Sequence, residues 1–146
     1  MKAKFVYEQL RMGDILKPKS TEEILPHLMK LFPVELLIKS SEIGFLPGVK
    51  LALERGADIH IKNELALQIA SNFGHKDVVK FLLNNGANIH ATNDWALTLA
   101  SRKNHIDVVK LLFKNGADVH ANYERALVEA LYYDNTEVVE LLKKYM

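Results

Sequence analysis

The stretch "NNGANIHATNDWALTLA", residues 84–100, decides the fold because "KNGADVHANYERALVEA", residues 114–130, repeats its pattern of Gly-Ala, His, acid and Ala-Leu. The Gly-Ala pairs that begin at Gly56, Gly86 and Gly116 are 30 residues apart. Columns of leucine, small residues and valine keep the same spacing and consist of Leu37, Leu67, Leu97 and Leu127; Ser40, Ala70, Ala100 and Ala130; and Val49, Val79, Val109 and Val139. A fixed internal period of this length predicts a protein built from stacked copies of one structural unit.

Each unit is predicted to form two antiparallel helices. In the unit at residues 65–94, apolar residues recur at helical spacing before and after Gly74-His75. Asn85-Gly86 then ends the second helix, because glycine tolerates the left-handed conformation that closes a helix. The units run over residues 35–64, 65–94, 95–124 and, truncated, 125–146. The sequence therefore predicts an all-α solenoid, built as one domain from stacked helix pairs.

These motifs resemble the ankyrin repeat. The family pattern places Gly-His between the two helices, and His75 and His105 stand at that histidine. It places Val-Val in the second helix, at the positions of Val78-Val79, Val108-Val109 and Val138-Val139. The resemblance covers residues 35–146 and implies stacked helix pairs whose concave face binds another protein.

Two consistent departures from the family pattern concern the start of the unit. The Thr-Pro that opens the first helix is replaced by Leu65-Ala66, Trp95-Ala96 and Arg125-Ala126. The unit has 30 residues, whereas the family's usual unit has about 33. The missing positions fall in the β-turn before the first helix, so we expect a blunted turn. Shortened repeats with "GADIHA" and "ND-aromatic-AL" look like those of giant DNA virus ankyrin proteins.

The two ends of the chain depart from the repeat. Residues 1–34 contain "STEEILPHLMKLF", whose Ser20 and Glu23 have the spacing of a helix capping box. We interpret residues 1–34 as a helical cap on the first unit; the alternative is a separate partner-binding tail. At the other end the Gly-Ala exit is absent and the last residues include Lys143-Lys144, so residues 125–146 are interpreted as a terminal cap.

A histidine and an acid lie four residues apart once in each unit. The pairs are His60 and Glu64, His90 and Asp94, and His120 and Glu124. The resemblance puts the histidines where asparagine braces the turn, and the acid stands where it could cap the first helix turn. Imidazole and carboxylate are also the material of metal sites and pH sensors, which is the alternative function of this row. Stacked units would arrange the pairs side by side and not around one point, so no catalytic site is predicted.

Columns that do not repeat are the candidates for partner binding, because stacked positions must stay small or apolar while the concave face is free to vary. Aromatic and guanidinium side chains dominate the energy of protein interfaces. The predicted partner-binding residues are Gln68, Trp95, Thr98, Arg102, Tyr123, Arg125 and Tyr132.

Composition narrows the class of partner. Lys plus Arg number 19 against 18 Asp plus Glu, so no broad cationic field favours nucleic acid. The chain has no cysteine, and no apolar run approaches the roughly 20 residues that span a bilayer. The first residues lack the apolar stretch of a secretory signal, so an intracellular, cytoplasmic setting is expected. The exposed lysines expected on the second helices are interleaved with acids such as Asp77 and Asp107, which favours a solvated face.

No nucleophile with a base, phosphate-binding loop or zinc-protease motif occurs in the sequence. The sequence therefore predicts a non-catalytic scaffold or adaptor that binds a partner protein on its concave face, without a cofactor and as a monomer. Two alternatives remain open at this point. One is a metal- or pH-responsive module that uses His60, His90 and His120, and the other is a structural subunit that self-associates through an end of the solenoid.

Overall fold

The computed structural model describes residue 26 and residues 30–146, and within them every regular element is a helix. The helices are α3 (Pro33–Ile43), α4 (Leu46–Glu54), α5 (Ile61–Phe73), α6 (Lys76–Asn84), α7 (Trp95–Arg102), α8 (Ile106–Lys114), α9 (Ala121–Tyr132) and α10 (Thr136–Lys143). The predicted all-α fold is confirmed. The cap predicted for residues 1–34 lies almost entirely outside the described residues.

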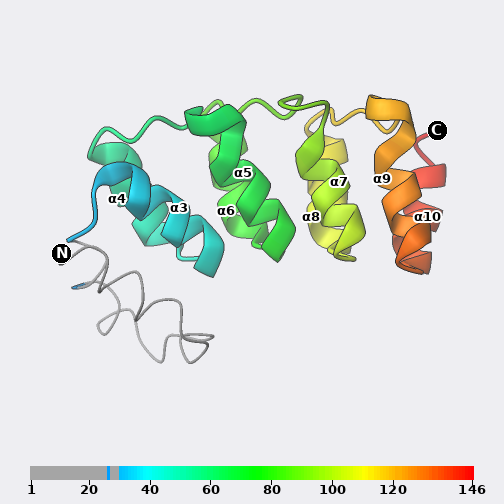
Figure 1. Ribbon diagram of the computed structural model, residues 1–146, viewed down its shortest axis with the longest axis horizontal. Coiled ribbons are helices and arrows are strands. Elements are labelled where there is room, and N and C mark those ends of the chain that lie inside the picture. The colour runs from blue at the N-terminus through cyan, green and yellow to red at the C-terminus, as the bar shows by residue number, and fades with distance from the viewer. Residues whose placement is uncertain (1–25, 27–29) are drawn as a thin grey trace.

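The helices form four antiparallel pairs that stand side by side in chain order (Figure 1). The first helices α3, α5, α7 and α9 make one layer, and α4, α6, α8 and α10 make the layer behind it. Each first helix packs against the first helix of the next pair, and each second helix against the next second helix. Contacts are therefore local along the chain, as in a solenoid. No helix in the described part of the chain combines the length and apolar character needed to cross a bilayer.

The residues of the repeated columns lie in the core of the stack. Leu37, Leu67 and Leu97 are at most 1% exposed, and Leu127 in the last pair is partly buried. The small and valine columns are buried in all four pairs: Ser40, Ala70, Ala100, Ala130, Val49, Val79, Val109 and Val139. Small side chains let the first helices approach closely, while branched residues of the second helices fill the space behind them.

A left-handed turn precedes each first helix from α5 onward. Thr92, Asn93 and Asp94 have φ of 54°, 56° and 55° before α7. The same conformation is found at Lys62, Asn63, Glu64, Asn122, Tyr123 and Glu124. In α5 and α9 these residues fall inside the helix bounds, and right-handed helix follows them. Left-handed backbone costs roughly 1–2 kcal/mol per non-glycine residue, so side-chain contacts must stabilise the turn.

Candidate functional site

The histidine and acid of each unit contact one another directly across the left-handed turn. His90 Nδ1 lies 3.1 Å from Asp94 Oδ2, and His120 Nδ1 lies 3.3 Å from Glu124 Oε1. His60 Nδ1 makes the equivalent hydrogen bond with Glu64. The predicted capping role of the acid was wrong, because Asp94 makes no side-chain hydrogen bond to the start of α7. Its left-handed backbone aims the carboxylate at the histidine instead.

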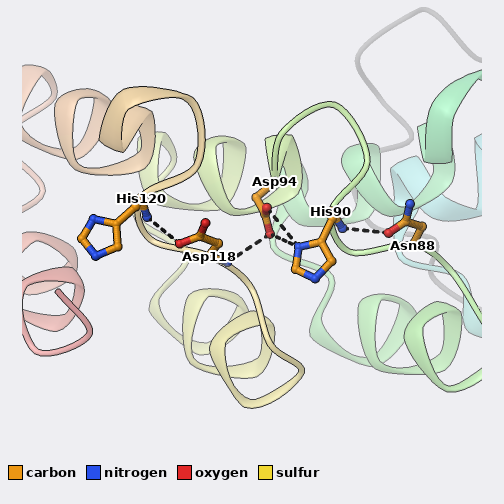
Figure 2. Close-up of polar contacts among 5 residues, drawn as sticks. All are labelled: Asn88, His90, Asp94, Asp118 and His120. Atoms are coloured by element: carbon orange, nitrogen blue, oxygen red, sulfur yellow. Dashed lines mark hydrogen bonds and ion pairs between the residues drawn. The ribbon is translucent and has the colours of Figure 1, made fainter.

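A hydrogen bond links the turn before α7 to the turn before α9, as Figure 2 shows. The His90 backbone N–H donates to Asn88 Oδ1 at 3.0 Å. Asp94 Oδ1 in turn accepts the backbone N–H of Asp118 at 3.2 Å, and Asp118 Oδ1 accepts the His120 N–H at 2.9 Å. The buried Asp94 carboxylate thus joins its own turn to the turn of the following unit.

Each histidine of the row faces the acid of its own turn. In the residues that the structure describes, no group of three or more His, Cys, Asp or Glu side chains is placed to hold a metal ion. The hydrogen bond from Glu64 and its negative charge, with a smaller effect of Asp58, raise the pKa of His60 above its usual value. The row is therefore a set of histidine–acid contacts, each within its own turn.

A second set of polar contacts joins the units at the opposite ends of the first helices. His75 Nε2 hydrogen-bonds the carbonyl oxygen of Glu42 at 2.8 Å, and His105 Nε2 hydrogen-bonds that of Asn72 at 2.9 Å. At the third junction Asn135 Nδ2 donates to the carbonyl oxygens of Ser101 and Arg102 at 2.8 and 2.9 Å. These side chains fix the backbone at the ends of the preceding first helices.

Glycine at the end of α5 leaves room for the histidine of the next unit. A Cβ on Gly74 would lie 2.5 Å from His105 Nδ1, and Gly74 has a φ of +76°. At the third junction Asn104 replaces the glycine with a φ of 60°, and the smaller Asn135 replaces the histidine. Where the wider asparagine replaces the glycine, a smaller asparagine therefore replaces the facing histidine of the next unit.

A row of variable side chains stands on this anchored backbone, at the ends of α5, α7 and α9. This helix-end row consists of Asn72, Phe73, Arg102, Lys103, Tyr132 and Tyr133. Tyr132 is 78% exposed, and its ring meets that of Tyr133 edge-on at a centroid distance of 5.0 Å. Arg102 is partly buried, and its Nε has no hydrogen-bond partner. The row combines aromatic surface with a cationic centre.

A family model of ankyrin repeats in three copies matches residues 36–123, more than half of the chain. The chain belongs to the ankyrin-repeat family. Its members are generally protein-interaction modules and are typically non-catalytic. A search of curated proteins found no match.

The predicted contact residues do not form one cluster on the ankyrin stack. Trp95 and Arg102 are the first and last residues of α7, so they are separated by roughly 10 Å along the helix axis. Tyr123 is 95% exposed in a left-handed turn, at the opposite end of α9 from Tyr132. The surface of the first helices therefore carries two regions, one at the turns and one at the helix ends.

Three predicted residues are already engaged in the ankyrin stack. Thr98 is 3% exposed and offers almost no surface. Gln68 Nε2 donates to the carbonyl oxygen of Asn63 at 2.7 Å, and Arg125 forms an ion pair with Glu129 at 2.6 Å. Trp95 is partly buried.

Sequence reasoning overlooked three members of the helix-end row, namely Phe73, Lys103 and Tyr133. All three are exposed, and they occupy one column of the repeat. The signal was present, since a column that holds Phe, Lys and Tyr at equivalent positions is as variable as the neighbouring column of Asn72, Arg102 and Tyr132.

Proposed function

We propose that this ankyrin-repeat protein is a scaffold or adaptor that holds a partner protein on the surface formed by its first helices, which we take as the concave face. The proposal rests chiefly on the helix-end row, where variable aromatic and cationic side chains stand on a repeated backbone. Trp, Tyr and Arg are the residues whose truncation most often weakens protein interfaces.

Anchoring of the row supports this function. The carbonyl groups of Asn72 and Arg102 are held by His105 and Asn135 of the following units. A binding surface whose backbone is already ordered loses less conformational entropy when the partner docks. Tyr132, as the most exposed aromatic residue of the row, is proposed as an anchor, together with Arg102.

The exposed surface of the second helices differs in chemistry. Lys80 and Lys110 are exposed at equivalent positions, and Asp77 and Asp107 each precede one of them by three residues. Lys76 reaches Asp107 at 3.8 Å. Interleaved charges of both signs are typical of a solvated face, so this side supplies the control for binding experiments.

A quantitative pull-down from native cell extract tests the function. The immobilised wild-type protein is compared with Arg102→Gln, with Tyr132→Ala and with the control Lys110→Gln, after circular dichroism shows that all four proteins are folded. We expect at least one captured protein to be lost with both row variants and retained with the control. The proposal is wrong if every protein captured by the wild type is captured equally by the row variants.

A monomeric state, an intracellular setting and an origin in a giant DNA virus belong to the same proposal. The last rests only on the resemblance of the "GADIHA" and "ND-aromatic-AL" motifs, and the intracellular setting on sequence composition.

A further inference from the structure

Arg102 differs from two other cations of the stack, Arg125 and Lys76, which each have an acidic partner. Arg125 is paired with Glu129 at 2.6 Å, and Lys76 with Asp107 at 3.8 Å. Among the described residues, no ion pair is formed by Arg102, and its buried Nε donates to nothing. The partly exposed Arg102 side chain is therefore not neutralised by an acid among the described residues.

The side chain at the equivalent position of α5 also has a buried polar atom without a hydrogen-bond partner. Asn72 occupies the equivalent position one unit earlier, and its Oδ1 is buried without a hydrogen-bond partner. Helices α5 and α7 pack side by side, so an unused acceptor and an unused donor occur at matching positions of adjacent helices. A peptide offers a carboxylate that matches the partly exposed Arg102 side chain.

Aromatic side chains flank this polar centre on both sides. Phe73 is exposed at the end of α5, and Tyr132 and Tyr133 are exposed at the end of α9. Lys103, next to Arg102, is also exposed and adds a second positive charge. The row therefore presents apolar surface, then positive charge, then apolar surface along the direction of the stack.

We propose that the helix-end row binds an acidic peptide segment, in which a carboxylate pairs with Arg102 and a neighbouring apolar side chain packs on Tyr132. This inference rests on the proposed function and names the chemistry of the partner. The planar guanidinium of arginine matches a carboxylate with two parallel hydrogen bonds.

The charges at the ends of the row favour an acidic peptide over a nucleic acid strand. Glu42 holds the equivalent position on α3, and Asp134 follows Tyr133. The positive charge is thus confined to Arg102 and Lys103, whereas a protein that binds single strands lines a longer groove with cations that follow the phosphates. A short cationic centre suits one or two carboxylates.

Selection from a random peptide library displayed on phage tests the inference on the full chain. We expect the wild-type protein to enrich peptides that carry Asp or Glu near an aromatic or aliphatic residue. A selected peptide, synthesised with a fluorescent label, should bind Arg102→Gln at least about tenfold more weakly. It should bind the matched charge-removing control Lys110→Gln as tightly as wild type, and thermal melts verify that both variants are folded.

Four results would overturn the inference. Enriched peptides could lack acidic residues, affinity could be indifferent to Arg102→Gln, or a labelled single-stranded oligonucleotide could compete with the peptide and depend on Arg102. Failure to enrich any peptide would also overturn it. None of these outcomes affects capture of a folded partner in the pull-down, so the proposed function and this inference can fail separately.

Discussion

Replacement of Gly74 by alanine should destabilise the protein through its contact with the next unit. The alanine would have to adopt a φ near +76°, and its Cβ would lie 2.5 Å from Nδ1 of His105. The left-handed backbone costs roughly 1–2 kcal/mol. Displacement of the ring would also remove its hydrogen bond to Asn72 O, which contributes about 1 kcal/mol. We therefore expect a total loss of roughly 2–3 kcal/mol of unfolding free energy.

A double-mutant cycle separates the steric contact from the backbone strain. Urea unfolding would be measured for Gly74→Ala, for His105→Ala and for the double variant. Because the truncated histidine no longer meets the new Cβ, Gly74→Ala should cost less in the His105→Ala background, with a coupling of about 1 kcal/mol. Gly86→Ala provides the control, since its Cβ would have nothing within 4 Å. That control should cost the same in both backgrounds.

Equal costs of Gly74→Ala in the two backgrounds would refute the reasoning. The loss would then come from the backbone conformation alone, and glycine at this position would have no connection with the histidine of the next unit. If only the Gly86→Ala control lost unfolding free energy, glycine at position 74 would likewise have no connection with His105.

Three further predictions concern single side chains. The raised pKa of His60 implies a contribution to stability that is complete below its unfolded pKa, about 6.5, and is lost as the pH rises through the folded pKa. Urea midpoints should therefore fall less between mildly acidic and mildly alkaline pH in His60→Gln than in wild type, and an identical pH dependence would contradict the Glu64 contact. Ser71→Ala should leave stability unchanged or raise it by up to about 1 kcal/mol in urea unfolding, because the buried hydroxyl has no partner; a clear loss would reveal a hydrogen bond. Tyr145→Ala should cost about 1 kcal/mol in the same assay, because its ring stacks on Phe113 at a centroid distance of 3.9 Å, and an unchanged midpoint would show that the stack is not formed in solution.

The fold was predictable because its determinants repeat. Each of the first three helix pairs carries its own apolar spacing and a Gly-Ala or Gly-His stop, and local signals of this kind need no knowledge of distant contacts. The columns of Leu67 and Val79 marked buried positions correctly. Repetition made the prediction stronger, since each column was observed several times in one chain.

The turns were not predictable to the same depth. Asp94 looked like a helix cap by its position, but three consecutive left-handed residues turn its carboxylate toward His90. A sign of this conformation was present in Asn63, Asn93 and Asn122, because asparagine tolerates left-handed backbone better than most residues. Three such residues in succession are rare enough that propensity alone favoured an ordinary turn.

Burial of Thr98 illustrates why variable positions are ambiguous in a solenoid. Its column holds Gln68, Thr98 and Val128, which differ as much as residues on a binding face. Thr98 lies in α7, which has helix pairs on both sides, and is 3% exposed, whereas Val128 in the last described pair is 49% exposed. Variation between repeats thus reflects position along the stack as well as partner binding, and only the packing of neighbouring helices separates the two causes.

The contacts that join the units also position the candidate binding residues. His105 holds the carbonyl of Asn72, and Asn135 holds that of Arg102, so each first helix has its end fixed by the unit that follows. Loss of either contact would weaken the stack and loosen the backbone beneath the helix-end row at the same time. A change at His105, which lies outside the row, is therefore expected to alter affinity through Asn72, and stability and binding in this protein share the same hydrogen bonds.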